Sequence, residues 1–580
     1  MILQALVDYY EALAKRGDIS PLGWCVERVS FSLNLSSDGR LLGVIPQMHN
    51  RQMGKKEVSV PDTMQVPERV IRSSGIKANF LCDNTSYILG FDQKGKPQRS
   101  RDCFRAAKQL HLKVLADCHG QAAAAVKGFF THWQPETATA HPTLQPYLEA
   151  MATANLVFRV EGGGCAQEDD EIRRAWQSHY RQSSEGPHLR CLATGKTEPV
   201  APLHGKIKGV PGAQSAGANL VSFNAPAYES YGQGEASSPN APVSEYAAFA
   251  YVTALNQLLA NRERRYQIGD ATVVFWAENA DPRPPQIFAD LLTPEPDTES
   301  RVAGILHNLS RGLPVDEVDL TKRFFVLGLA PNAARISVRF FLQNSFGDML
   351  EKLKLHYEQL DIERPSFDQR QYLSPSALLA ETVNPNSQDK AASPLLSGAV
   401  MRSILTGARY PEALLSSVMG RIRAEQNISR GKAAIIKACL LRNYNDMKEV
   451  VTVPLNKGCN DRAYVLGRLF AVLEDIQRGA NPNLNRTIKD KYLTSACTTP
   501  GSVFPLLLKL SSYHITKSRH YHKEREKAEL LNRLEVTQNP LPAHHTPKEQ
   551  GLFMLGYYQQ MQASFKRSNT KEEKPDDSNQ

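Results

Sequence analysis

The hydrophobic pattern of this chain changes along its length, and that change limits the folds that it can adopt. Apolar residues from Leu3 to Leu13 repeat with helical spacing, which predicts a helix over residues 2–15. Apolar and polar residues then alternate from Val29 to Leu35, a turn follows at Ser36–Gly39, and an apolar run begins at Leu41, which together predict a β-hairpin. Near the end the spacing becomes helical again, at Leu466, Leu469, Phe470, Leu473 and Ile476.

This pattern predicts an α+β protein, with mixed N-terminal and central domains followed by a C-terminal helical bundle. A chain of 580 residues is long enough for several domains. We predict an N-terminal α+β domain at 1–155, a central domain at 156–345, a helical region at 346–446, a bundle at 447–565 and a disordered tail at 566–580. Within the N-terminal domain we expect helices near residues 102–118 and 141–157.

The composition is that of an ordinary globular protein, with 41% hydrophobic and 22% charged residues. The net charge of +9 permits a polyanionic partner but does not require one. No stretch is apolar enough for a membrane span, and the start does not resemble a signal peptide. Nine cysteines without a CxxC pair indicate free thiols, so we expect a cytoplasmic protein.

Motifs for catalysis are missing from the sequence. The fifteen histidines form no HExxH or Cys/His metal pattern, and there is no GxSxG elbow. The Gly-Lys pairs at 195–196 and 205–206 lack the glycine spacing of a phosphate-binding loop. For the basic run Lys517–Lys523, which contains two histidines, a solvated helix face is favoured over a metal site. We therefore expect no enzyme activity, no metal site and no cofactor.

Two basic segments are candidates for binding nucleic acid, because lysine and arginine neutralise phosphates while amides read base edges. The first contains Arg72, Lys77 and Asn79, and continues into the segment Asp92–Arg101, which we predict to be a turn-rich loop carrying Lys94, Lys96, Arg99 and Arg101. The second is a glycine-rich loop with Lys206 and Lys208. In each case the alternative is a solvated surface loop.

A polar segment, residues 221–258, combines amides, hydroxyls, aromatic rings and turn formers before it becomes helical. Its candidate DNA-binding residues are Asn224, Ser230, Tyr231 and Asn240. The alternative is a structural loop whose side chains bind backbone groups. Arg335 and Arg339 share one face of either a strand or a helix. One prediction is that they contact a nucleic-acid backbone, and the alternative is that they only pair with carboxylates.

Parts of the polar segment, Phe223-Asn224, Ser230–Gly232 and Asn240–Ser244, resemble the hallmark segment of the large subunit of type I-C CRISPR interference (Cascade) complexes. Other similar segments keep the family order along nearly the whole chain: Met1–Tyr10, Asn79–Asn84 with Tyr87–Gly90, Ile207–Ser215, Val274–Glu278, Val326–Arg335 with Val338-Arg339, Ile404–Pro411, Tyr464–Phe470 and Gln550–Tyr558.

The resemblance implies a non-catalytic subunit of an RNA-guided DNA surveillance complex. Such a subunit recognises the protospacer-adjacent motif in duplex DNA, aids duplex opening, holds the displaced strand and helps to recruit a helicase–nuclease. The implied partners are guide RNA within the complex, double-stranded target DNA, other Cascade subunits and the helicase–nuclease, with no membrane. The alternatives are a nucleic-acid hydrolase, which would need clustered carboxylates for metal ions, and a structural scaffold that contacts only proteins.

In the type I-C family the small subunit is similar to the C-terminal part of the large subunit and arises by internal translation. Met447 lies between two helical patterns, so a start there would produce the C-terminal bundle alone. The basic segment Lys517–Arg525 would then lie along the displaced strand. The alternative is that Met447 is an ordinary internal residue.

Overall fold

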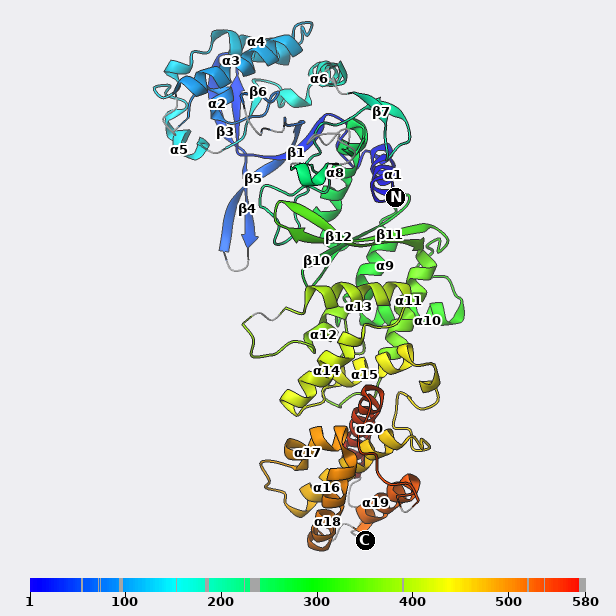
Figure 1. The fold of residues 1–580 in the computed structure, drawn as a ribbon. Coiled ribbons are helices and arrows are strands. Elements are labelled where there is room, and N and C mark those ends of the chain that lie inside the picture. Colours follow the sequence, from blue (N-terminus) through cyan, green and yellow to red (C-terminus); the bar gives the residue numbers. More distant parts are fainter. Residues whose placement is uncertain are drawn as a thin grey trace, which may run out of the picture. The chain divides into compact units, whose positions relative to one another are not determined.

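The protein combines several small β-sheets with a predominantly helical C-terminal half, as Figure 1 shows. The structure is a computed structural model, and it describes residues 1–53, 56–70, 72, 75–92, 97–152, 154–182, 187–223, 225–229, 240–388, 391–518, 521–536 and 538–572. The chain forms two compact units. The first unit comprises Met1–Gly209 and Ser215–Gln257, and the second comprises Val210–Gln214 and Leu258–Gln580. The predicted α+β class is confirmed, while the finer division into domains stays a prediction.

The first unit contains two three-stranded sheets and a two-stranded one. One sheet has the order β3-β2-β6, in which the predicted hairpin forms from β2 (Phe31–Leu35) and β3 (Leu41–Pro46), and β6 (Leu156–Val160) adds in parallel to β2. The second has the order β1-β5-β4, from β1 (Trp24–Val29), β4 (Met48–Met53) and the long β5 (Lys56–Pro67). A hairpin of β7 (His188–Arg190) and β8 (Thr197–Pro199) follows.

Helices of the first unit contribute residues to the core around strands β1, β2 and β6. The helices of this unit are α1 (Ile2–Arg16), α2 (Thr85–Ile88), α3 (Pro97–Val114), α4 (Gln121–His132), α5 (Leu148–Met151), α6 (Asp170–Gln182) and α8 (Glu245–Ala260). The helix expected at 141–157 is wrong, because that region forms the short 3-10 turn Gln145–Tyr147, the one-turn α5 and the beginning of β6. Pro142 and Pro146 disfavour a continuous helix there, and β6 is buried as the parallel partner of β2.

The second unit begins with an antiparallel sheet of order β12-β11-β10-β9, formed by β9 (Arg265–Ile268), β10 (Ala271–Ala277), β11 (Arg323–Asn332) and β12 (Arg335–Ser345). The helices between and after these strands are α9 (Arg283–Leu292), α10 (Glu299–Arg311), α11 (Phe346–Leu360), α12 (Pro375–Ala380), α13 (Pro394–Thr406), α14 (Glu412–Glu425) and α15 (Arg430–Asn443). The final helices are α16 (Arg462–Ala480), α17 (Ile488–Thr498), α18 (Pro500–Ser518), α19 (Tyr521–Leu534) and α20 (Pro547–Glu572).

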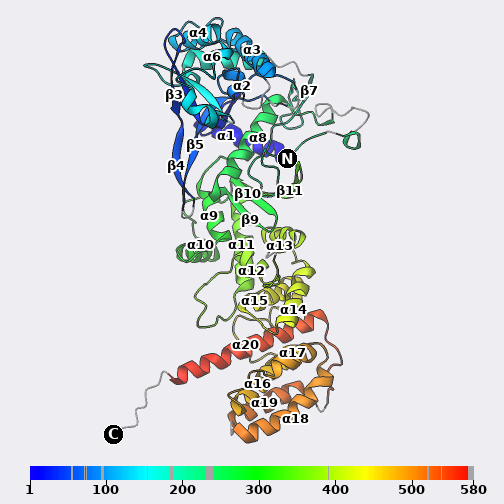
Figure 2. The same cartoon turned by 90° about the vertical axis from the view of Figure 1, so that its left-hand side faces the viewer.

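One continuous hydrophobic core runs through the second unit, from Tyr266 in β9 to Met561 in α20. All five periodic residues of the predicted C-terminal helix are buried in α16, so that prediction is confirmed. The long helix α20, red in Figure 2, packs against α16 and also against α14 and α15. The C-terminal helices therefore share their core with the helical region that precedes them.

Two further observations concern the whole chain. Among the described residues, no helix is both long enough and apolar enough to cross a membrane. The nine cysteines are all described and all have free thiols, and eight of them are buried.

Candidate nucleic-acid interface

The first basic segment is organised around a carboxylate, Asp83, whose side chain is fully buried. Asp83 accepts two hydrogen bonds from the guanidinium of Arg72, one from Nη1 at 3.0 Å and one from Nη2. It also accepts the backbone N–H groups of Asn79 at 3.0 Å and Asn84 at 2.9 Å. The Arg72 guanidinium lies over the ring of Tyr87, 3.9 Å from its centroid. Arg72 therefore neutralises a buried acid and fixes the fold of its loop.

Asn79 is buried in the same network, and its side-chain oxygen accepts the N–H of Val70 at 2.9 Å. Lys77 differs, because its side chain is exposed while its carbonyl accepts a 2.6 Å hydrogen bond from Nε of Arg72. Of these three predicted residues, the geometry leaves Lys77 as the one that presents its charge to solvent. Arg72 and Asn79 act, on these contacts, by holding the loop that carries Lys77.

Arg99 and Arg101 lie in the first turns of α3, so the turn-rich loop predicted for them is wrong. The reason is Pro97, because a proline at the first helical position fits the backbone angle and needs no hydrogen-bond donor. Arg99 is exposed, and Arg101 donates to Gln98 Oε1 at 3.1 Å. Lys94 and Lys96 lie outside the described residues.

The helix adds two cations that we did not predict. Arg105 is four residues after Arg101, and Lys108 is three residues further on, so all three share one face of α3. Arg105 donates to Asp102 at 3.1 Å, and Lys108 reaches the carbonyl of Thr131 at 3.5 Å. The signal for this face in the sequence is Pro97, because a proline favours a helix start early enough to include Arg101.

The second basic loop is held by one asparagine of α8. The side-chain oxygen of Asn256 accepts the N–H of Lys208 at 2.8 Å, and its amide nitrogen donates to the carbonyl of Lys206 at 3.0 Å. Between the two lysines, Ile207 and Ala218 exchange backbone hydrogen bonds of 2.8 and 2.9 Å. The loop thus presents both lysines on a fixed backbone. Asn256 lies in the polar segment, but nothing in the sequence alone indicates that it reaches this loop.

Glu27 of β1 pairs with one cation of the second basic segment and with Arg69, which lies just before the first segment in the chain. Its carboxylate lies 3.3 Å from Nζ of Lys208 and 3.5 Å from Nη1 of Arg69. Arg69 follows the end of β5 and precedes Arg72 by three residues. Two cations share this single carboxylate, which balances only one of their two charges.

His204 anchors the start of the second loop. Its Nδ1 lies 2.8 Å from the hydroxyl of Tyr251, a buried residue of α8. Burial lowers the pKa of His204 to about 4, so the ring is neutral at pH 7. Its carbonyl accepts a 3.0 Å hydrogen bond from the amide of Asn219, on the returning side of the loop. The histidine therefore has a structural role here.

The polar segment is described only in part. Asn224, Ser230 and Tyr231 lie outside the described residues, and Asn240, which precedes α8 in the chain, is half-buried. The residues after Asn240 join neighbouring elements: the Pro242 carbonyl accepts the N–H of Leu192 at 2.8 Å, and the Ser244 hydroxyl accepts the N–H of Ala247 at 3.2 Å. Ser244 thus caps α8, which is a structural use of this part of the segment.

Two other basic candidates are engaged in ion pairs. Arg339 in β12 donates to Asp270 at 2.8 Å, which is a pairing of the kind that the carboxylate alternative expects. In the C-terminal basic segment, Lys523 pairs with both Asp475 and Glu526. Lys517 is exposed and donates to Asn481 at 2.6 Å. The charge of this segment is therefore partly neutralised within the second unit.

Comparison with known proteins gives one family. A search of curated proteins returned no match. The profile of the family described as "CRISPR-associated protein (Cas_Csd1)" matches residues 6–565, which include every described basic residue named above. Because this match extends over nearly the whole sequence, the chain belongs to the Cas_Csd1 family of CRISPR-associated proteins.

Proposed function

We propose that this chain is the non-catalytic large subunit of a type I-C, RNA-guided DNA surveillance complex. In this role it recognises the protospacer-adjacent motif in duplex DNA, aids duplex opening, holds the displaced strand and helps to recruit a helicase–nuclease. Sequence selection is delegated largely to pairing between guide RNA and target, while the protein reads the short motif and the backbone. The chain itself cleaves nothing.

The observation that carries this proposal is the family match over residues 6–565. The geometry of the first unit supports it, because Glu27 pairs both with Lys208 and with Arg69, which precedes Arg72 by three residues. A loop braced by Asn256 presents Lys206 and Lys208, and the loop organised by Asp83 presents Lys77. Cations on fixed backbones suit phosphate contacts, which position a duplex without reading its sequence.

Recognition of a specific motif needs base-edge readers in addition to these cations. Asn224, Ser230, Tyr231 and Asn240 of the polar segment are the residues that we assign to that role, since amides pair with adenine edges and tyrosine stacks on an unpaired base. Alanine at these four positions should weaken binding to motif-containing DNA more than to DNA without the motif. Equal weakening on both DNAs would favour the structural alternative.

The salt dependence of duplex binding tests the phosphate contacts. Removal of each cation that binds a phosphate should flatten the slope of log K against log salt by about one unit. We expect this flattening when Lys77, Lys94, Lys96, Arg99 and Arg101 are changed to glutamine. The matched control removes the same charge from exposed cations elsewhere: Arg40, Arg311, Lys322, Arg402 and Lys448. If both variants keep the slope of the unaltered chain, or flatten it equally, these residues are not the duplex site.

A further inference from the structure

An exposed phenylalanine stands at the tip of a surface turn in the second unit. Phe367 is 86% exposed, more than any other aromatic side chain among the described residues. It lies between α11 and α12, in the turn Pro365–Asp368, which is closed by the N–H of Asp368 donating to the carbonyl of Pro365 at 3.0 Å. Leaving a phenylalanine in water forgoes the favourable free energy of burying its ring.

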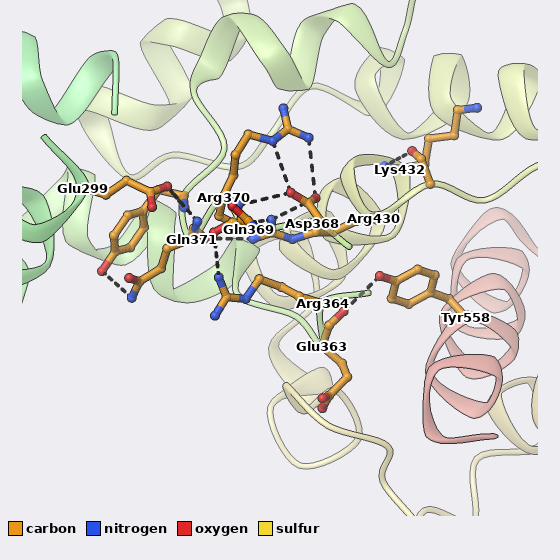
Figure 3. A network of polar contacts seen from close by, with 12 residues as sticks. Glu299, Glu363, Arg364, Asp368, Gln369, Arg370, Gln371, Arg430, Lys432 and Tyr558 are labelled. Carbon is orange, nitrogen blue, oxygen red and sulfur yellow. Dashed lines mark hydrogen bonds and ion pairs between the residues drawn. The ribbon is translucent and has the colours of Figure 1, made fainter. Parts of the chain in front are cut away.

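A buried arginine fixes the turn from one side, as Figure 3 shows. Arg430, the first residue of α15, donates from Nη1 to Asp368 Oδ2 at 3.2 Å and to the carbonyl of Arg370 at 2.5 Å. Its Nη2 donates to the carbonyl of Gln371 at 2.8 Å. Arg370 in turn donates from Nε to Asp368 Oδ1 at 3.2 Å. The loop is therefore held by charge-assisted bonds to its backbone as well as to its side chain.

Other elements brace both ends of the loop. Tyr558 of α20 donates its hydroxyl to the carbonyl of Glu363 at 2.9 Å, and the N–H of Glu363 donates to the carbonyl of Val453 at 3.3 Å. On the other side, Glu299 of α10 accepts the N–H of Gln371 at 2.7 Å (Figure 3). These bonds from α10, α15 and α20 hold the backbone of the turn rigidly. The loop that carries Phe367 therefore loses little conformational entropy when a ligand binds.

The charges around the tip are arranged with cations outside and anions inside. Arg370 and Lys566 pair with Asp368 and Glu363, and the two basic side chains are 62% and 67% exposed, whereas the two acidic ones are 10% and 19% exposed. Arg364 is exposed beside them, and with Lys566 it lines a shallow polar hollow next to the turn. In each of these two pairs the cation is therefore the member that is exposed to solvent.

We propose that Phe367 is a stacking platform for an unpaired base of single-stranded nucleic acid, with Arg364, Arg370 and Lys566 contacting the adjoining phosphates. Every base has an aromatic face, so such a platform holds a strand without reading its sequence. The outward cations favour a polyanion over an apolar pocket on a protein partner. This inference rests on the proposed function and adds a strand-holding site that the first-unit cations do not provide.

Equilibrium binding of a fluorescein-labelled oligothymidylate, about 20 nucleotides long so that it exceeds a typical single-strand site, tests the proposal on the full-length chain. Phe367→Ala should weaken binding by about 5- to 50-fold, in line with the loss of one stacked base. Phe367→Trp should bind as tightly as the original chain, and Phe367→Leu should bind like the alanine variant, because leucine is apolar but cannot stack. The matched control is Leu395→Ala, which removes another exposed apolar side chain, 76% exposed, and should change nothing.

The Phe367→Trp variant also supplies a direct fluorescence signal. Of the four native tryptophans, three are buried and one is half-buried: Trp24, Trp176 and Trp276, and Trp133. The difference in fluorescence between Phe367→Trp and the original chain therefore comes from the exposed indole ring at position 367. Quenching of that difference signal by oligothymidylate is the expected result.

Three results would overturn the inference. If the original chain binds the oligonucleotide and Phe367→Ala binds equally well, the stacking site is wrong while the proposed function stands. If Phe367→Ala leaves this binding unchanged but loses companion subunits on purification, the turn docks a protein instead. If the original chain binds neither the oligonucleotide nor a duplex, the proposed function fails together with the inference.

Discussion

At the scale of single residues, one carboxyl group makes the stability of the first unit depend on pH. Burial raises the pKa of Glu68 to about 7 from an ordinary value of 4.5, although the hydroxyl of Tyr180 donates a 2.5 Å hydrogen bond to it. Because the folded pKa is the higher one, ionising Glu68 opposes folding. Stability contributed by this group is complete below pH 4.5 and is lost as the pH rises to about 7.

Glu68→Gln should therefore raise Tm above pH 7, by the equivalent of about 1–3 kcal/mol, and leave Tm unchanged near pH 4.5. The substitution keeps an acceptor for the Tyr180 hydroxyl. Glu149→Gln, at an exposed position, is the control, and at each of the two pH values its Tm should equal that of the original chain. A Glu68→Gln variant that is less stable than the original at about pH 8 would contradict this role of the carboxyl group.

A second residue-scale prediction concerns the asparagine that holds the basic loop. Asn256→Ala removes the bonds to the backbone of Lys206 and Lys208 without changing any charge. We expect duplex affinity to fall by about threefold to thirtyfold, since each of the two lost hydrogen bonds contributes about 1 kcal/mol, while the salt slope stays the same. Duplex titration at several salt concentrations measures both quantities. A flattened slope would show that Asn256 acts through the number of phosphate contacts instead.

At the scale of elements, two glycines set the contact between α16 and α20. A Cβ atom on Gly467 would overlap the backbone of Phe553, and a Cβ atom on Gly556 would overlap the backbone of Tyr464. Gly467→Ala should therefore destabilise the second unit by about 1–3 kcal/mol, despite the better helix propensity of alanine. Gly420→Ala in α14 is the matched control, because a Cβ there meets no atom within 4 Å. Thermal unfolding should show a lower Tm for the first variant and no decrease for the second.

Elements with a strong repeating pattern could be predicted from the sequence, and those defined by their neighbours could not. The β2–β3 hairpin and α16 follow directly from alternation and helical spacing. The strand β6 carries the run Leu-Val-Phe-Arg-Val without a clear period, and it is a strand because β2 pairs with it.

The same contrast holds for the candidate interface. Lysines and arginines at 72–101 and 206–208 stand out by composition alone. The residues that hold these cations are less apparent. Arg72 pairs with Asp83, and Asn256 binds the backbone of Lys208, which lies 48 residues earlier in the chain. Contacts of this kind depend on tertiary packing, so sequence patterns identify the exposed cations but not the residues that hold them.

At the scale of the whole molecule, the continuous core of the second unit bears on the proposed internal start. Met447 is 3% exposed at the end of the short turn after α15, and α20 packs against both α15 and α16. A fragment beginning at Met447 keeps α16–α20 but loses α15, so it would expose the part of the α20 surface that packs against α15. That part includes Gly551, where an added Cβ atom would lie 3.4 Å from Ile436. We expect such a fragment to need a partner that covers this face.

Mass spectrometry of protein expressed from the intact gene tests the internal start. The prediction is a C-terminal fragment that begins at Met447 and co-purifies with the full-length chain. Met447→Leu should remove the fragment while keeping an apolar side chain at a buried position. An unchanged fragment pattern in that variant, or no fragment in the original, would show that Met447 is an ordinary internal residue.

The central claim is that the chain works as a subunit of an RNA-guided complex, and co-purification tests it most directly. The full-length chain, tagged and expressed together with the other CRISPR-associated proteins and a CRISPR array, should retain a small guide RNA and a fixed set of companion subunits at physiological salt. Recovery of the tagged chain alone, with neither RNA nor companion subunits, would contradict this claim.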